Sequence, residues 1–302
     1  MMNVRKVIVI TGGAKGIGRV LVDRFAALPN YAVSTCDILF DEATTTSTTT
    51  LPSSSSTQAA ADATNDDDES RNGVIYRHKA DVSREDDVRD FIQATIDQFG
   101  PRIDCLINNA AVANPYLAYG SSSTGALEDL DMTEFQRVLQ INLVNPVLLA
   151  KYCTPYLRRD TTSPTTSSRP AGCIIHISST RAQMSEPYSE AYAASKGGLE
   201  ALTHSLAMSL QKDAIRVNAV APGWIHVPSS SSSDTATTTA EESSYTPTPA
   251  DHSFHPVGRV GTANDIFAVC VFLADATKSG FITGQTITVD GGVTKKMIYP
   301  EE

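Results

Sequence analysis

The chain begins with a strand, a glycine-rich turn and a helix in direct succession, and this succession limits the possible folds more than any other feature. Residues 4–10 are apolar and β-branched, which is typical of a strand buried on both faces. The turn TGGAKGIG follows at residues 11–18, and residues 19–27 have helical periodicity. Glycines let a backbone approach a pyrophosphate, and a helix N-terminus offers free N–H groups and a positive dipole end. In this order the glycines favour a dinucleotide-binding α/β unit over an ordinary turn.

An acidic residue after the second candidate strand bears on the choice of cofactor. Residues 32–36 predict a strand that ends at Asp37, about 20 residues beyond the glycine turn. A carboxylate at this place accepts from a ribose 2′-OH and repels a 2′-phosphate, so it favours NAD over NADP. Lys15 in the turn argues the other way, because its ammonium could bind a 2′-phosphate. We give Asp37 more weight because its position is more constrained. A strand-end cap and a solvated lysine are the alternative interpretations.

The rest of the chain alternates between candidate strands and candidate helices. Strands are predicted at 74–79, 103–107, 171–177, 215–220 and 286–289, and helices at 84–99, 133–156, 188–211 and 263–273. Such alternation implies a parallel sheet with right-handed crossovers. We therefore predict an α/β fold, a single-domain Rossmann-like doubly wound parallel sheet of about seven strands with helices on both faces. Its ligand should lie along the carboxyl ends of the strands.

Four segments rich in Ser and Thr interrupt this pattern, and we interpret them as low-complexity insertions within one domain that spans residues 1–302. These segments have too little apolar surface to offset the entropy of ordering, which predicts disorder. The predicted insertions are 42–72, 121–125, 160–169 and 228–252.

One helical stretch carries a candidate acid/base pair. Tyr192 and Lys196 are four residues apart, so on a helix they share one face. A phenol has a pKa of about 10 in water, and a nearby cation favours the phenolate. Such a pair can move a proton on or off an alcohol oxygen near neutral pH. Taken alone, a surface tyrosine stacked on a lysine stem is the more common arrangement.

Other motifs in the chain favour the acid/base interpretation of Tyr192 and Lys196. With them, the chain resembles the classical short-chain dehydrogenase/reductase family over nearly its whole length outside the insertions. The motifs appear in the order typical of the family: TGGAKGIG at 11–18, an Asp after the second strand, DV at 81–82, NNA at 108–110, Asn142, ISS at 177–179, YAASK at 192–196, APGW at 221–224 and VDGG at 289–292. The family has the fold predicted above.

The resemblance implies a role for each matching residue. Tyr192 would be the general acid/base, Lys196 would lower its pKa and contact the nicotinamide ribose, and Ser179 would hydrogen-bond the substrate oxygen. Asn142 would support a water-linked proton relay behind the lysine. The cofactor would be held by Gly12, Gly16, Ile17 and Gly18 at the pyrophosphate, Asp81 and Val82 at the adenine, Asn109 and Ala110 near the adenosine ribose, and Pro222, Gly223 and Ile225 at the nicotinamide.

These residues predict a reversible oxidation of a secondary alcohol to a ketone with NAD, or with NADP as the less favoured cofactor. Two alternatives stay open. One is an NADPH-dependent reductase that acts on a 3-oxoacyl or sugar carbonyl. The other is a catalytically silent dinucleotide-binding sensor, which the unusual composition of segment 228–252 would favour. The family also implies a homotetramer or a homodimer, in which the helices at 133–156 and 188–211 pair across subunits.

Composition argues against several other partners. A net charge of −10 over 302 residues is unfavourable for binding nucleic acid or anionic lipid. No apolar run approaches the roughly 20 residues of a membrane span, and the start of the chain lacks a signal-peptide cleavage region. Five scattered cysteines predict buried, reduced thiols, which favours a cytoplasmic location. His226, His252 and His255 flank the last insertion, where solvated histidines are favoured over metal ligands, so no metal is predicted.

Overall fold

The seven predicted strands form one parallel sheet. The computed structural model of the chain describes residues 5–41, 48–50, 73–114, 116–119, 126–158, 170–227 and 245–297. In spatial order the parallel strands are β10 (Thr286–Val289), β7 (Arg216–Pro222), β6 (Cys173–Ile177), β5 (Cys105–Asn108), β1 (Lys6–Thr11), β2 (Tyr31–Asp37) and β4 (Val74–Lys79). The predicted fold class is therefore confirmed. Since β1 lies between β2 and β5, the winding direction reverses there, and ligands of such sheets bind outside the strand ends at that point.

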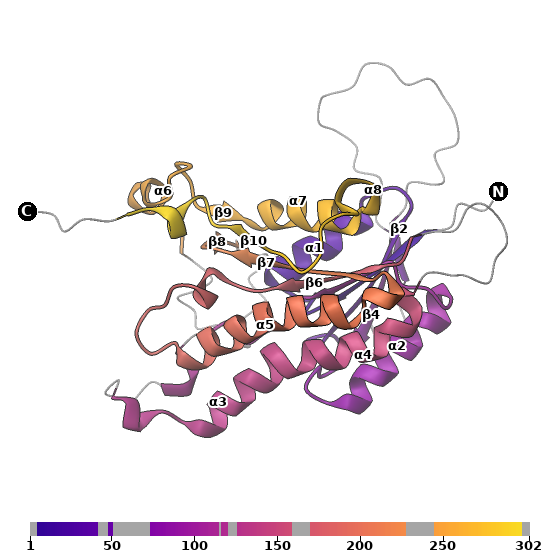
Figure 1. The fold of residues 1–302 in the computed structure, drawn as a ribbon, viewed down its shortest axis with the longest axis horizontal. Coiled ribbons are helices and arrows are strands. Elements are labelled where there is room, and N and C mark those ends of the chain that lie inside the picture. Colours follow the sequence, from indigo (N-terminus) through magenta and orange to yellow (C-terminus); the bar gives the residue numbers. More distant parts are fainter. Residues whose placement is uncertain are drawn as a thin grey trace, which may run out of the picture.

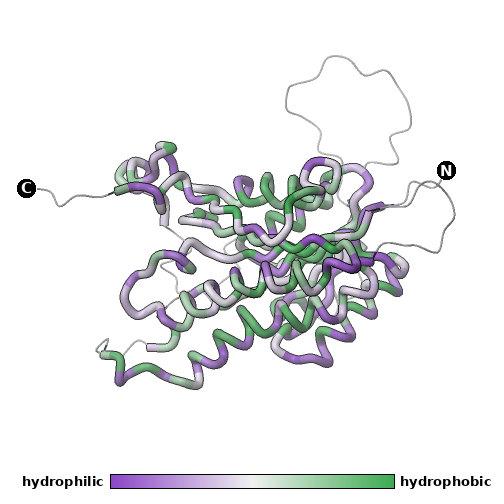
Figure 2. The backbone as a smooth tube through the Cα atoms, viewed as in Figure 1, coloured by the Kyte–Doolittle hydropathy of each residue, from purple (hydrophilic) through white to green (hydrophobic). Residues whose placement is uncertain are grey.

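Helices cover both faces of the sheet (Figure 1). On one face lie α1 (Gly16–Ala26) and α7 (Ala263–Ala274), and on the other lie α2 (Glu85–Phe99), α4 (Asn145–Leu157) and α5 (Glu190–Ser209). Figure 2 shows hydrophobic stretches along the central strands and along α4 and α7, whereas the connecting segments are mostly hydrophilic or neutral. A parallel sheet enclosed in this way needs apolar side chains on both faces of each strand, which explains the near-continuous apolar runs in the sequence.

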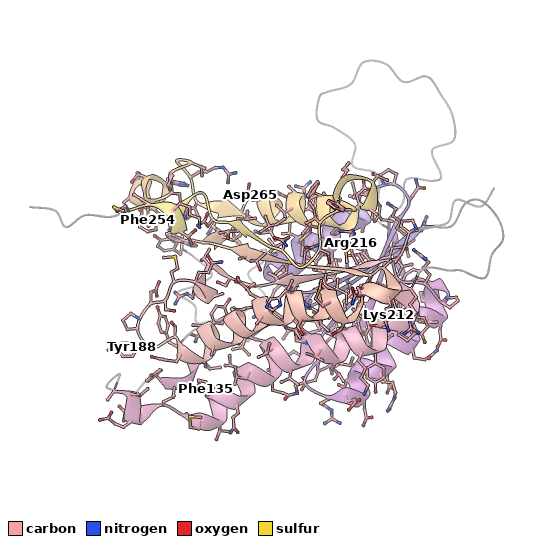
Figure 3. The ribbon with its side chains drawn as sticks, viewed as in Figure 1. Phe135, Tyr188, Lys212, Arg216, Phe254 and Asp265 are labelled. Carbon is pink, nitrogen blue, oxygen red and sulfur yellow. The ribbon has the colours of Figure 1, made fainter. Side chains whose placement is uncertain are left out.

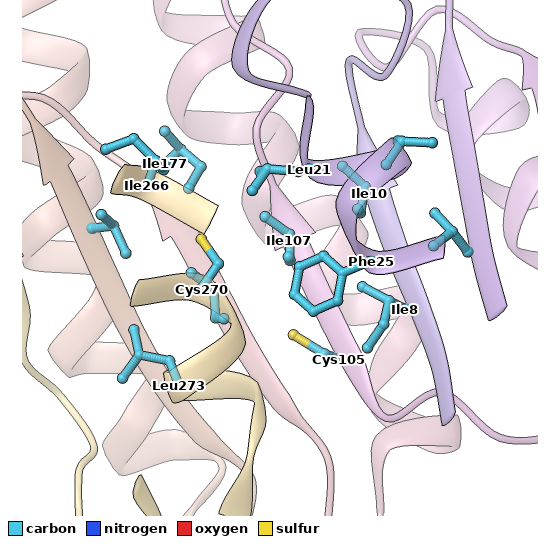
Figure 4. Close-up of a cluster of buried hydrophobic side chains, with 14 of the residues drawn as sticks. Ile8, Ile10, Leu21, Phe25, Cys105, Ile107, Ile177, Ile266, Cys270 and Leu273 are labelled. Atoms are coloured by element: carbon cyan, nitrogen blue, oxygen red, sulfur yellow. The ribbon is translucent and has the colours of Figure 1, made fainter. Parts of the chain in front are cut away.

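One of the two main cores joins α1 and α7 to the sheet. Figure 4 shows Phe25 of α1 and Cys270 of α7 facing the strands, with isoleucines of three strands beneath them. The ring of Phe25 meets that of Phe267 edge-on, with the centroids 5.2 Å apart. This packing holds the C-terminal half of α1 against α7 and the sheet.

The helix predicted at 133–156 is interrupted. The structure divides it into α3 (Met132–Leu139), a π-helical turn η5 (Gln140–Val144) and α4. A π turn inserts one extra residue into a helix and is often found at functional sites. Here the π turn contains Asn142, so the predicted continuous helix is interrupted at a predicted catalytic residue.

Most of the predicted insertions lie outside the described residues: 42–47, 51–72, 121–125, 160–169 and 228–244. Two parts of them have regular structure that we did not predict. Thr48–Thr50 form strand β3, which pairs antiparallel with β4. The end of the 228–252 segment contains helix α6 (Pro249–Phe254), where Thr248 and Asp251 form a capping box. The prediction of disorder was therefore wrong for these two parts, because β-branched threonine suits a sheet edge and the cap satisfies the helix start.

Candidate active site

A cavity of about 1020 Å³ lies at the carboxyl ends of the parallel strands. Every residue predicted to bind the cofactor lines this cavity, as do Ser179, Tyr192 and Lys196 among the predicted catalytic residues. The lining set is Gly12, Lys15, Gly16, Ile17, Gly18, Asp37, Asp81, Val82, Asn109, Ala110, Ser179, Tyr192, Lys196, Pro222, Gly223 and Ile225. The structure thus brings together residues that are spread over most of the chain. Asn142 is not part of the lining.

The glycine turn forms a close-fitting cradle. A Cβ atom at Gly18 would lie 2.0 Å from the carbonyl oxygen of Gly12 and 2.4 Å from Nδ2 of Asn109. Gly16 has a φ of +62°, and a Cβ built there would meet nothing within 4 Å. The backbone therefore faces open space at Gly16, directly at the start of α1, where free N–H groups accumulate. These features fit the pyrophosphate of a dinucleotide.

Asn109 holds this cradle in place. Its Nδ2 donates to the carbonyl oxygens of Thr11 and Gly12 at 3.0 and 3.1 Å. In return, Oγ1 of Thr11 accepts from the backbone N–H groups of Asn109 and Ala110 at 3.1 and 3.0 Å. Because both donor bonds of the amide are made to the protein, Asn109 sets the shape of the turn.

Two carboxylates stand at the end of the cavity where an adenosine would lie. Asp37 accepts from the backbone N–H groups of Ala14 and Leu39, both at 3.0 Å. Each carboxylate oxygen offers two lone pairs, so both oxygens of Asp37 keep acceptor capacity for ribose hydroxyls. Asp81 accepts from the N–H and the hydroxyl of Ser83 through one oxygen, Oδ1, at 2.9 and 2.7 Å. This turn carries Val82 to the cavity wall.

The three polar groups of the predicted reaction centre come from two elements. Ser179 follows β6 and lies within hydrogen-bonding range of the phenol of Tyr192 in the first turns of α5. Lys196 is 3% exposed, and its Nζ lies 5.5 Å from the centroid of the Tyr192 ring. The same Nζ donates to the carbonyl oxygen of Ile177 at 2.8 Å. The end of β6 therefore positions both the serine and the lysine.

The pKa of Tyr192 differs from our expectation. We expected Lys196 to lower it, but burial raises the pKa of the phenol, and the Ser179 hydrogen bond and the positive charge of Arg181 offset this only in part. Burial also lowers the pKa of Lys196 to about 8. The loss of hydration outweighs the nearby charges, and the ammonium of Lys196 is engaged by a carbonyl, so the role of Lys196 in lowering the pKa of Tyr192 remains a prediction.

Asn142 lies behind the cavity wall and is 1% exposed. Its Oδ1 accepts from Val112 N–H at 2.8 Å, and its Nδ2 donates to Val112 O and to Oγ of Ser195, both at 3.1 Å. The amide thus joins the segment after β5 to α5, one residue before Lys196. The relay role assigned by resemblance remains a prediction, whereas the positioning role follows from these contacts.

The cavity wall beyond β7 is held by backbone contacts. Gly223 donates to the carbonyl oxygen of Val289 at 2.9 Å, and a Cβ on Gly223 would lie 2.7 Å from Cβ of Asp290. Ile225 lies in the short strand β8 (Ile225–His226), which pairs with β9 (Gly261–Thr262). The close approach explains why glycine follows Pro222 in the sequence.

Sequence reasoning missed four side chains that line the substrate end of the cavity: Arg181, Glu186, Phe254 and His255. Only Arg181 had a sequence signal, since it follows Ser179 by two residues. Its backbone N–H donates to Oγ of Ser179 at 3.2 Å. His255 was expected to be a solvated loop residue, but it is 2% exposed. Its position after α6 explains the difference, because the helix packs it against Trp224.

The described residues contain no group of three or more His, Cys, Asp or Glu side chains that could hold a metal ion. None of the helices in the described ranges is long and apolar enough to cross a bilayer. All five cysteines are free and buried, as the sequence predicted.

Comparisons with known proteins show similarity to oxidoreductases over most of the chain. The model of a family described as Enoyl-(Acyl carrier protein) reductase matches residues 49–294. An oxidoreductase of Thermotoga maritima is 42% identical over 225 residues, which cover 74% of this chain and 77% of that protein. The L-fucose dehydrogenase of Oryctolagus cuniculus is 31% identical, with 95% of this chain and 84% of that protein covered. The ligand-free aldohexose dehydrogenase of Thermoplasma acidophilum has a TM-score of 0.69 and 25% identity, over 99% of this chain and 98% of that one.

Proposed function

Because the chain belongs to the short-chain dehydrogenase/reductase family, we propose that it interconverts a secondary alcohol and a ketone with NAD as its preferred cofactor. The observation that carries this proposal is the meeting of Ser179, Tyr192 and Lys196 in the cavity that also contains the glycine cradle. A catalytically silent sensor would not need these three side chains in one place.

In the oxidation, the substrate hydroxyl binds between Oγ of Ser179 and the phenol oxygen of Tyr192. Tyr192 accepts the hydroxyl proton, and Ser179 steadies the substrate oxygen. When bound, the nicotinamide supplies the hydride acceptor. The Ser179 hydrogen bond and the positive charge of Arg181 favour the ionised form of the phenol against the opposing effect of burial. In the reduction the same phenol returns its proton to the ketone oxygen.

The proposal is tested by hydride transfer. The protein is incubated with NAD and a panel of secondary alcohols that includes simple cyclic alcohols, sugars and hydroxyacyl thioesters, and NADH formation is followed by absorbance. We expect turnover with at least one substrate class. Tight NADH binding with no turnover on any class, in either direction, would support the sensor instead.

A second candidate function is the reduction of an acyl or sugar carbonyl with NADPH. Lys15 lines the cavity and could meet a 2′-phosphate, and the matching family model is named for an acyl-carrier-protein reductase. The two relatives named for sugars support a sugar substrate for either direction of the reaction. Cofactor preference therefore separates the two candidates.

Replacing Asp37 with alanine is expected to lower the ratio of NADH to NADPH affinity by roughly tenfold or more, the size of one lost charge-assisted hydrogen bond. Asp37→Ala removes the acceptor of the ribose hydroxyls and the charge that repels a 2′-phosphate. Fluorescence titration with both cofactors measures the ratio. Asp37→Asn serves as the control for the Ala14 and Leu39 contacts, since it keeps one acceptor oxygen. An unchanged ratio in Asp37→Ala would mean that Asp37 does not determine the cofactor preference.

We further propose a homotetramer or a homodimer in which the α3–α4 and α5 helices pair between subunits. Val144 and Val147 near the start of α4 and Met208 near the end of α5 are exposed in the single chain. Apolar side chains at these positions suit a helix-to-helix contact, in which burial stabilises the assembly.

A further inference from the structure

The cavity wall next to Tyr192 carries an ion pair. Arg181 belongs to the short helix η6 (Thr180–Ala182), and its Nη2 lies 2.8 Å from Oε2 of Glu186. The hydroxyl of Tyr116 donates to the same carboxylate oxygen. The guanidinium acts electrostatically on Tyr192, which places its charge near the reacting hydroxyl. Because Glu186 balances that charge, the wall is polar and close to neutral.

The lining of the same cavity also contains a histidine, His255, whose tautomer follows from its hydrogen bond. Nδ1 of His255 lies 2.8 Å from the carbonyl oxygen of Asp251. A carbonyl can only accept, so Nδ1 carries the proton and Nε2 of the neutral ring is an acceptor. The ring of His255 lies 6.0 Å from that of Trp224. Figure 3 shows Phe254, which precedes His255, and Tyr188, which follows Glu186 by two residues, at the same end of the molecule.

Arg181 and His255 each have one buried polar atom without a hydrogen-bond partner among the described residues. These atoms are Nη1 of Arg181 and Nε2 of His255. One is a donor and the other an acceptor, and both residues line the same cavity. Leaving such buried groups unpaired costs free energy, which a ligand that supplies both partners recovers. Side-chain shifts of the kind common on binding would expose the two atoms.

We propose that these side chains bind the neighbouring hydroxyl groups of a neutral, polyhydroxylated substrate, with Arg181 donating to one hydroxyl and His255 and Glu186 accepting from others. This inference rests on the proposed oxidoreductase function, because the bound hydroxyls orient a further hydroxyl toward Tyr192. Each alcohol group is both donor and acceptor, so a polyol satisfies both unpaired atoms. The exposed indole of Trp224 offers an apolar surface for the C–H face of such a ring.

Two other substrate classes fit these side chains less well. A carboxylate would pair with Arg181 but would meet the negative charge of Glu186, which already occupies the guanidinium. An acyl chain would leave Nη1 and Nε2 unpaired and would place apolar carbon against an ion pair. The near-neutral charge of the wall, together with one unpaired donor and one unpaired acceptor, is therefore matched best by a sugar or a cyclitol.

Saturation-transfer NMR on the NADH-loaded protein tests this inference without requiring turnover. The probes are D-glucose, L-fucose and myo-inositol, with cyclohexanol as a ligand that has one hydroxyl. We expect at least one polyol to bind more tightly than cyclohexanol, and Arg181→Met to weaken that polyol by about tenfold or more while cyclohexanol changes little. Arg137→Met is the matched control, because Arg137 also lines the cavity but its Nε is paired with Glu134 at 2.9 Å. It should bind the polyol like the unaltered protein.

Equal polyol affinity in the unaltered protein and in Arg181→Met would overturn the inference, as would a preference for cyclohexanol over all three polyols. Circular dichroism shows whether Arg181→Met folds. If it does not, Glu186→Gln replaces it in the same binding experiment. This half-exposed carboxylate can be neutralised without a change in side-chain volume. The proposed function is tested separately by incubating the protein with NAD and the bound polyol. Polyol binding without NADH formation would contradict the proposed function and leave the binding inference intact.

Discussion

Replacing Tyr192 with phenylalanine is expected to lower kcat/KM for alcohol oxidation by about 10²- to 10⁴-fold, the usual contribution of one general acid/base group. The change removes only the phenol oxygen, so the ring keeps its packing in α5. Loss of the proton acceptor leaves the substrate hydroxyl protonated as hydride transfer begins. The affinity for NADH should remain nearly the same, because the cradle at residues 12–18 and the carboxylate of Asp37 are untouched.

Steady-state kinetics and a fluorescence titration with NADH measure these two quantities. Tyr152→Phe is a matched control, because its hydroxyl donates to Glu85 at 2.8 Å on the exposed surface and does not line the cavity. It should have normal activity. Loss of activity and of NADH affinity to the same degree in Tyr192→Phe would mean that the tyrosine has a structural role.

The second large effect is expected at the glycine cradle. A methyl group at Gly18 would lie 2.0 Å from a backbone carbonyl oxygen and 2.4 Å from Nδ2 of Asn109, so Gly18→Ala must displace the turn or the asparagine. We expect this variant to bind NADH at least about tenfold more weakly and to lose roughly 1–3 kcal/mol of unfolding free energy, as is usual for overpacking. Activity should fall along with cofactor affinity.

Gly73→Ala provides the control that separates stability from binding. A Cβ atom there would lie 1.7 Å from the carbonyl oxygen of Ala26, so the clash is as severe but lies away from the cavity. Urea unfolding should show a loss of stability in both variants, whereas NADH titration should show weaker binding in Gly18→Ala alone. If Gly18→Ala binds NADH normally, the pyrophosphate does not lie against this turn.

The fold was predictable because its signals are local. Apolar β-branched runs, such as residues 171–177, are typical of strands buried on both faces, and their alternation with helical periodicity leaves little choice but a parallel sheet. Right-handed crossovers then bring all carboxyl ends to one edge. For this reason Gly12, Asp37 and Ser179 could be assigned to one site before any distance was known, and the cavity contains all three.

Other parts of the site could not be predicted, because they depend on contacts between distant segments. The π turn at Gln140–Val144 has no distinctive composition, yet it directs Asn142 toward Val112 and Ser195. The pairing of Arg181 with Glu186 and the burial of His255 likewise arise from loop packing. Ser/Thr-rich composition concealed β3 and α6, since it indicates low average burial and carries little information about short pairings.

By itself the sequence determined which elements form, their order, and the one-turn spacing that places Tyr192 and Lys196 on the same helix face. These follow from backbone geometry, in which periodicity and glycine conformation act over a few residues. Only the tertiary structure decided how charged each group is and what it touches. Burial raises the pKa of Tyr192 and lowers that of Lys196 to about 8 because desolvation depends on everything packed around a group. A local sequence pattern does not contain this information, because the packed groups come from distant parts of the chain.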